Sequence, residues 1–65
     1  MEEKRKEIIM RFGALKPYIK RKAVEKMSGV NDRTFANYMS GGYISEEKIK
    51  RIDKALNALE EVFMQ

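Results

Sequence analysis

The sequence predicts an all-α fold, a compact bundle of four to five short helices that forms a single domain over residues 1–65. Apolar residues recur at steps of three and four along most of the chain, which is the period of an amphipathic helix. Glycine and proline interrupt this pattern at intervals that suit short helices. No alternation of polar and apolar residues is long enough to predict a strand. A chain of this length buries roughly 60% of its unfolded surface, so one small core must hold these helices together.

The first helix is predicted over Glu2 to Leu15. Ile8, Phe12 and Leu15 lie at steps of four and three, and the residues between them are mostly charged. Pro17 should stop or restart the helix, because proline lacks the amide hydrogen that a continuing helix needs. We therefore expect one apolar face along this helix and a break just after it.

A second helix is expected to begin between Pro17 and Lys20. It should end at Ser28 and Gly29, because glycine tolerates the left-handed conformation that often closes a helix. Its buried face is predicted from apolar residues at helical spacing: Ile19, Ala23, Val24 and Met27. Basic residues occupy most of its other sides: Lys20, Arg21, Lys22 and Lys26.

The third helix is predicted from Asn31 to Ser40. Asn31 is a good N-cap, because its side chain can accept a hydrogen bond from an amide two or three residues on. Phe35, Tyr38 and Met39 lie three and four residues apart and should face the core. The outward arc is then polar and mostly small: Asp32, Arg33, Ala36, Asn37 and Ser40.

Gly41 and Gly42 should break the third helix. Ser45 then caps a last helix, and the two acids that follow it suit a first helical turn. Along this helix, apolar residues recur at alternating steps of three and four and form one continuous seam: Ile49, Ile52, Leu56, Leu59 and Phe63.

Positive charge is concentrated in the first half of the chain. The formal net charge is +4, and residues 11–33 carry seven cations against two anions. A basic stretch of this kind suits a phosphate-rich partner. The alternative is a generic basic surface.

Composition also excludes several kinds of site. The chain has no cysteine and no histidine, so disulfides and the usual zinc ligand sets cannot form. No apolar run approaches the roughly 20 residues of a membrane span, and the first residues do not resemble a secretory signal. We therefore expect a cytoplasmic protein with no membrane partner. The acids are scattered over helix faces, so no enzyme, cofactor, metal or small-molecule ligand is expected.

The segment from Arg21 to Ser40, RKAVEKMSGVNDRTFANYMS, resembles the helix-turn-helix of phage Cro-type and lac-type repressors. That family has apolar residues five positions before the turn glycine and one, six and nine positions after it. With Gly29 as the turn glycine, all four are present: Val24, Val30, Phe35 and Tyr38. The following GGYISEEKIKRIDKAL is similar to the lac-type continuation, so the resemblance extends to about Ala58.

One residue departs from the family pattern. Four positions before the turn glycine the family usually has a small residue, where the two helices cross, and this chain has Glu25. Either Glu25 points outward through a wider crossing, or the turn carries one extra residue. Such an insertion would place Val24 at the crossing and Met27 in the apolar position before the turn. Of the two, we prefer the insertion.

The resemblance implies which residues would contact DNA. Base contacts fall on Asp32, Arg33, Ala36 and Asn37, at the first exposed positions of the third helix and one turn later. Arg33 suits guanine and Asn37 adenine, whereas Asp32 could accept from cytosine or simply favour the helix dipole. Contacts to the DNA backbone are expected from Lys20, Arg21, Lys22, Asn31, Thr34, Ser40 and Tyr43. The alternatives are a cap alone for Asn31, a turn tyrosine covering the core for Tyr43, and a solvated surface for the others.

The resemblance further implies a sequence-specific binder of double-stranded DNA, a transcriptional repressor or regulator. Such proteins usually bind two DNA half-sites with one protomer on each, so a homodimer is expected. Its interface is predicted on the last helix, at Ile52, Leu56, Leu59, Val62 and Phe63, unless these residues all pack into the core. The rival function is a helical protein-interaction module that uses the same apolar seam and does not bind DNA.

Overall fold

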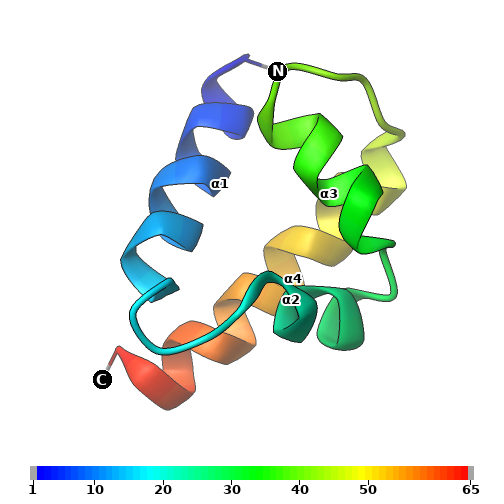
Figure 1. The fold of residues 1–65 in the computed structure, drawn as a ribbon. Coiled ribbons are helices and arrows are strands. Elements are labelled where there is room, and N and C mark those ends of the chain that lie inside the picture. The colour runs from blue at the N-terminus through cyan, green and yellow to red at the C-terminus, as the bar shows by residue number, and fades with distance from the viewer. Residues whose placement is uncertain (1, 65) are drawn as a thin grey trace.

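The computed structural model of the chain describes residues 2–64, and this part contains four helices and no strand. The helices are α1 (Glu2–Leu15), α2 (Arg21–Ser28), α3 (Asp32–Met39) and α4 (Glu46–Phe63). Figure 1 shows α1 standing opposite the short α2–α3 pair, with the long α4 running behind them. The predicted all-α bundle is confirmed, with four helices rather than five in the described residues.

The core draws on every helix and on both loops that flank α3. Its buried residues are Ile8, Phe12, Leu15, Val24, Val30, Phe35, Tyr38, Ile44, Ile52, Ala55, Leu56 and Leu59. At its centre the ring of Phe12 meets that of Phe35 edge-on, with 5.3 Å between centroids. The helical spacing therefore identified most of the core. Met27 and Phe63 are exceptions, because they are 52% and 40% exposed.

The turn after α1 belongs to α1 rather than to α2. The carbonyl of Leu15 accepts hydrogen bonds from the amides of both Tyr18 and Ile19, at 2.9 and 3.0 Å. Residues 16–18 are thereby folded back onto the end of α1, so α2 begins only at Arg21. The predicted start of the second helix, between Pro17 and Lys20, was therefore slightly early.

The turn between α2 and α3 has no extra residue. Gly29 follows α2 directly with φ 76°, in the left-handed region that glycine adopts at little cost. Ser28 is buried and Met27 is exposed, which is the reverse of what an insertion requires. The insertion that we preferred is wrong. Glu25 is half-buried and is not among the core residues.

Both predicted N-caps of the last two helices are confirmed. Oδ1 of Asn31 accepts from the amide of Arg33 at 2.8 Å, and Oγ of Ser45 accepts from that of Lys48 at 3.3 Å. These caps fix where α3 and α4 begin.

The apolar seam of α4 packs against its own chain. Ile52 and Leu56 are completely buried and Leu59 nearly so, whereas Val62 is 71% and Phe63 40% exposed. Side chains that are buried in the core of one protomer are not available to contact a second protomer. The predicted dimer interface is therefore wrong for Ile52, Leu56 and Leu59, and only its last two residues remain accessible.

A network around Arg11 ties α1 to α4. The guanidinium donates to both carboxylate oxygens of Glu60, at 2.9 and 3.1 Å, to Oδ1 of Asn57 at 2.6 Å, and to the carboxylate of Asp53. Arg11 is one of the seven cations of residues 11–33, but these acids compensate its charge. No helix in residues 2–64 has both the length and the apolar character needed to cross a membrane.

Candidate nucleic-acid interface

The outward arc of α3 is held in place by the two residues that α3 buries. Phe35 and Tyr38 lie in the core, so the opposite side of this helix faces solvent. Arg33 and Asn37 are both exposed on that side, four residues and therefore about one turn apart. Ala36 and Thr34 are half-buried. Of the four predicted base contacts, Arg33 and Asn37 are thus the ones the structure leaves most accessible.

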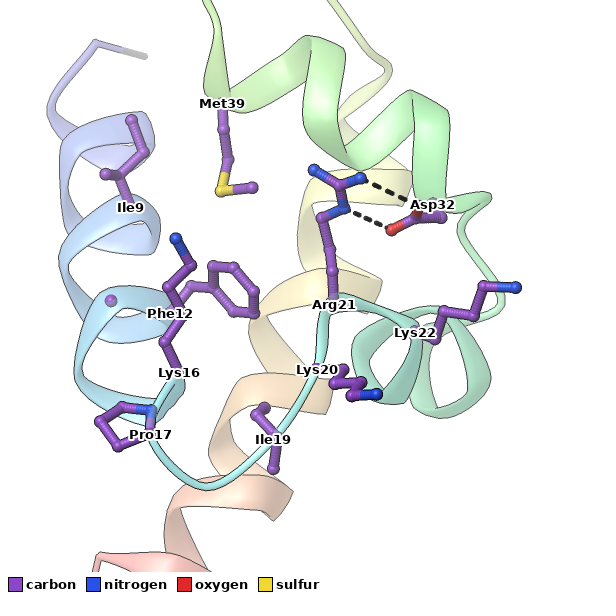
Figure 2. Close-up of a pocket in the computed structure, with 11 residues that line it drawn as sticks. Ile9, Phe12, Lys16, Pro17, Ile19, Lys20, Arg21, Lys22, Asp32 and Met39 are labelled. Atoms are coloured by element: carbon purple, nitrogen blue, oxygen red, sulfur yellow. Dashed lines mark hydrogen bonds and ion pairs between the residues drawn. The ribbon is translucent and has the colours of Figure 1, made fainter.

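Asp32 and Arg21, predicted for different roles, form one ion pair. Nε and Nη2 of Arg21 donate to the two carboxylate oxygens of Asp32, at 2.6 and 3.2 Å. Figure 2 shows Arg21 reaching from the start of α2 to the first turn of α3. The pair is bidentate, the arrangement that holds a guanidinium most firmly. Asp32 therefore faces Arg21, and the same contact orients Arg21 at the junction of the two helices.

The start of α2 carries a cluster of cations. Lys20 is the N-cap residue and Lys22 lies in the first turn, beside Arg21. Within residues 2–64, no carboxylate forms an ion pair with Lys20, Lys22 or Arg33. The first amides of a helix and the positive end of its dipole both attract anions. This end of α2 therefore combines two sources of positive potential.

The other predicted backbone contacts are spread along α3 and beyond. Asn31 is exposed at the start of α3, where its Oδ1 acts as the cap described above. The hydroxyl of Ser40 donates to the carbonyl of Ala36 at 3.0 Å, so its hydrogen is already used within the helix. Tyr43 is 91% exposed in the loop after α3. The alternative that Tyr43 covers the core is wrong.

Sequence reasoning missed Arg5, which joins the first turns of α1 to the end of α3. Its guanidinium lies 5.0 Å from the centre of the Tyr38 ring, and Nη2 donates to the carbonyl of Gly42 at 2.9 Å. Both contacts hold the C-terminal end of α3 against α1. Helical spacing gives no signal for such a residue, because Arg5 lies on a charged stretch.

Among the described residues, no group of three acidic, histidine or cysteine side chains lies close enough together to hold a metal ion.

Comparison of the chain with protein-family models, with curated proteins and with solved structures finds no match.

Proposed function

We propose that this chain binds double-stranded DNA, with α3 in the major groove and the start of α2 against the phosphate backbone. The observation that carries the proposal is the exposed pair Arg33 and Asn37 on a helix whose other side is anchored in the core. An arginine can bond both acceptors of guanine, and an asparagine the donor and acceptor of adenine. Two such residues one turn apart could read neighbouring bases.

Charge placement supports the same orientation. The start of α2 holds three cations: Lys20, Arg21 and Lys22. Because Arg21 bonds Asp32, this end of α2 lies beside the first turn of α3. If all three met phosphates, the logarithm of the binding constant would fall with that of salt concentration at a slope of about −3. The role of a regulator or repressor rests on the family resemblance of residues 21–58.

The structure weakens the support for the rival function. A protein-interaction module built on α4 needs the apolar seam of this helix, and Ile52, Leu56 and Leu59 are buried against the other helices. The seam therefore has too little accessible surface left to dock a partner helix.

A homodimer remains part of the proposal, on a smaller surface. Val62 and Phe63 are exposed, and the ring of Tyr18 stacks on that of Phe63 with 5.9 Å between centroids. Together these side chains could cover one another across a twofold axis. Val62→Asp should then lower the apparent mass in sedimentation at high protein concentration, while leaving the fold unchanged by circular dichroism.

Selection of bound sequences from a random duplex pool tests DNA binding directly. We expect a recurring motif, and we expect Arg33→Ala to lose the preference at one base position, a loss of about 1–3 kcal/mol in discrimination. Lys54→Ala, an exposed cation on α4, is the matched control and should keep the motif. Absence of any duplex binding at low salt would overturn the proposal.

Asp32→Asn separates a base contact from a positioning role. Because Asp32 is bound to Arg21, we expect this change to strengthen binding to all sequences by about two- to fivefold, since it removes one negative charge near the phosphates. The selected motif should stay the same. Loss of preference at a single base position in gel-shift titrations would instead assign Asp32 to base reading.

A further inference from the structure

An open groove of about 930 Å³ lies between α1, the turn after it, the first turn of α2 and both ends of α3. Figure 2 shows Ile9 and Phe12 on its α1 side, Met39 at the end of α3, and Arg21 with Asp32 across from them.

The floor of the groove is apolar and partly accessible. Ile9 is 39% exposed, Met39 and Ile19 are half-buried, and the ring of Phe12 lies beneath them in the core. Ile19 and Met39 also pack against the core, so the floor is the outer edge of the core that the helices leave partly uncovered. Apolar surface that collects in a concave site is typical of a binding groove.

Gly13 keeps one wall of the groove open. It lies inside α1, and a Cβ placed there would meet no other atom within 4 Å. A glycine within a helix makes the helix less stable than an alanine at the same position would. The absence of a side chain at this position therefore leaves space in the groove at a cost to the helix.

The rim of the groove is basic. Lys16, Lys20 and Lys22 line it, and none of them pairs with a carboxylate within residues 2–64. Asp32 is the one acid among the lining residues, and Arg21 already binds both of its oxygens. Figure 2 shows the ammonium of Lys16 reaching into the groove and that of Lys22 pointing away from it, so a negatively charged occupant would meet Lys16 first and Lys20 and Lys22 at the outer edge of the rim.

We propose that this groove docks an acidic amphipathic segment of another protein. Carboxylates on the segment would pair with the lysines of the rim, and its apolar side chains would cover Ile9 and Met39. A DNA backbone matches the rim but has no apolar side group for the floor, because its outer surface consists of sugars and phosphates. The combination of charge and apolar floor thus favours a peptide over a duplex.

Docking of this segment would interfere with DNA. Lys20, Arg21 and Lys22 serve both the groove and the proposed phosphate contacts. The peptide and the duplex would therefore compete, and this part of the inference rests on the proposed function. The docking itself does not depend on it.

The test uses a fluorescein-labelled synthetic helical peptide of about 15 residues, with leucines at i, i+4 and i+7 and glutamates beside them. Its control is a scrambled peptide of the same composition, which has no apolar stripe. Fluorescence anisotropy should show binding of the first peptide, at least about fivefold tighter than that of the second and weaker in high salt.

Two variants of the groove sharpen this test. Gly13→Gln fills the groove without adding charge, and Lys16→Glu reverses one charge on its rim. Each variant should bind the amphipathic peptide at least about fivefold more weakly than the parent chain does. Lys54→Glu makes the same charge change on α4, outside the groove, and should have less than about a twofold effect. Thermal unfolding confirms that each variant is folded.

Failure of the docking proposal is distinct from failure of DNA binding. Equal binding of both peptides, equal loss in Lys16→Glu and Lys54→Glu, or no loss in Gly13→Gln would overturn the docking site. Weaker duplex binding in Gly13→Gln with unchanged peptide binding would assign the groove to DNA instead. Arg33→Ala should alter only the base preference for duplexes and leave peptide binding unchanged, because Arg33 lies outside the groove.

Discussion

The hydroxyl group of Ser28 is buried at the turn between α2 and α3 and is bonded on both sides. The hydroxyl donates a hydrogen bond to the carbonyl of Val24 at 2.6 Å, and its oxygen accepts one from the amide of Val30 at 3.1 Å. A buried polar group is tolerated only with such partners. One small side chain thus links the last turn of α2 to the second residue of the loop, Val30.

Ser28→Ala should therefore lower the free energy of unfolding by about 1–2 kcal/mol, because the buried amide of Val30 loses its partner. Urea unfolding followed by circular dichroism measures this change. Ser40→Ala is the matched control, since the exposed hydroxyl of Ser40 bonds only within its own helix, and it should change stability by less than about 0.5 kcal/mol. Equal losses in both variants would contradict the role given to Ser28.

Single charged residues were the least predictable part of the molecule. The sequence suggested that Arg11 and Arg21 belong to one basic surface, yet each has carboxylate partners 11 or more residues away. Which acid a long side chain meets depends on how two helices cross, and helical spacing within one helix carries no such information. Arg33 and Asn37 were predictable as exposed, because their exposure follows from the buried positions of α3 alone.

At the scale of the helices, the close approach between the end of α3 and the loop after it depends on Gly42. The amide of Gly42 donates to the carbonyl of Asn37 at 2.7 Å, and a Cβ on Gly42 would lie 2.8 Å from that same oxygen. This oxygen belongs to the backbone, so it cannot move aside cheaply. The loop can therefore approach α3 this closely only with glycine at this position.

Gly42→Ala should destabilise the domain by about 1–3 kcal/mol through this steric overlap. Gly13→Ala is an informative comparison, because the same substitution meets open space within α1 and should instead stabilise the domain by up to about 1 kcal/mol. Thermal unfolding of the two variants measures whether each substitution raises or lowers the stability of the domain. No loss of stability in Gly42→Ala would show that the close approach at Gly42 does not limit stability, whereas destabilisation in Gly13→Ala would contradict the open space at Gly13.

The helices themselves were largely predictable. Apolar spacing located α1, α3 and α4 to within about a residue at their starts, and the capping residues Asn31 and Ser45 marked two of those starts. The start of α2 was not predictable in the same way, because a proline can either open a helix or end one. The hydrogen bonds to the carbonyl of Leu15 decide between these, and they depend on how the turn packs.

At the scale of the whole molecule, the contacts of Arg11 with α4 make stability depend on pH. The hydrogen bond from Arg11 holds the pKa of Asp53 below its ordinary value; partial burial opposes this shift, and a second bond from Lys4 adds to it. A carboxylate with a lowered pKa in the folded state stabilises the fold above the pKa of the unfolded chain, about 4. That contribution is lost as pH falls from there through the folded pKa.

Stability should accordingly be constant near neutral pH and decrease below about pH 4. Asp53→Asn should lower the free energy of unfolding at pH 7 by about 1 kcal/mol and should make the decrease in acid smaller. Urea unfolding at several pH values measures both effects. Glu61→Gln, which changes an exposed acid of α4 for which no ion pair is formed within residues 2–64, is the control. If the free energy of unfolding decreased below pH 4 by the same amount in Asp53→Asn as in the parent chain, this assignment would be contradicted.

The chain has no tryptophan, and its three tyrosines lie in three different surroundings. Tyr38 is in the core, Tyr18 stacks on Phe63 near the end of α4, and Tyr43 is in the open loop after α3. In variants that keep one tyrosine and replace the others by phenylalanine, the tyrosine fluorescence would come from one known position. Tyr38 would then report global unfolding, Tyr18 the detachment of the last turn of α4, and Tyr43 the approach of a bound partner to the loop. The fold therefore supplies an optical probe for each of these three events, without any attached dye.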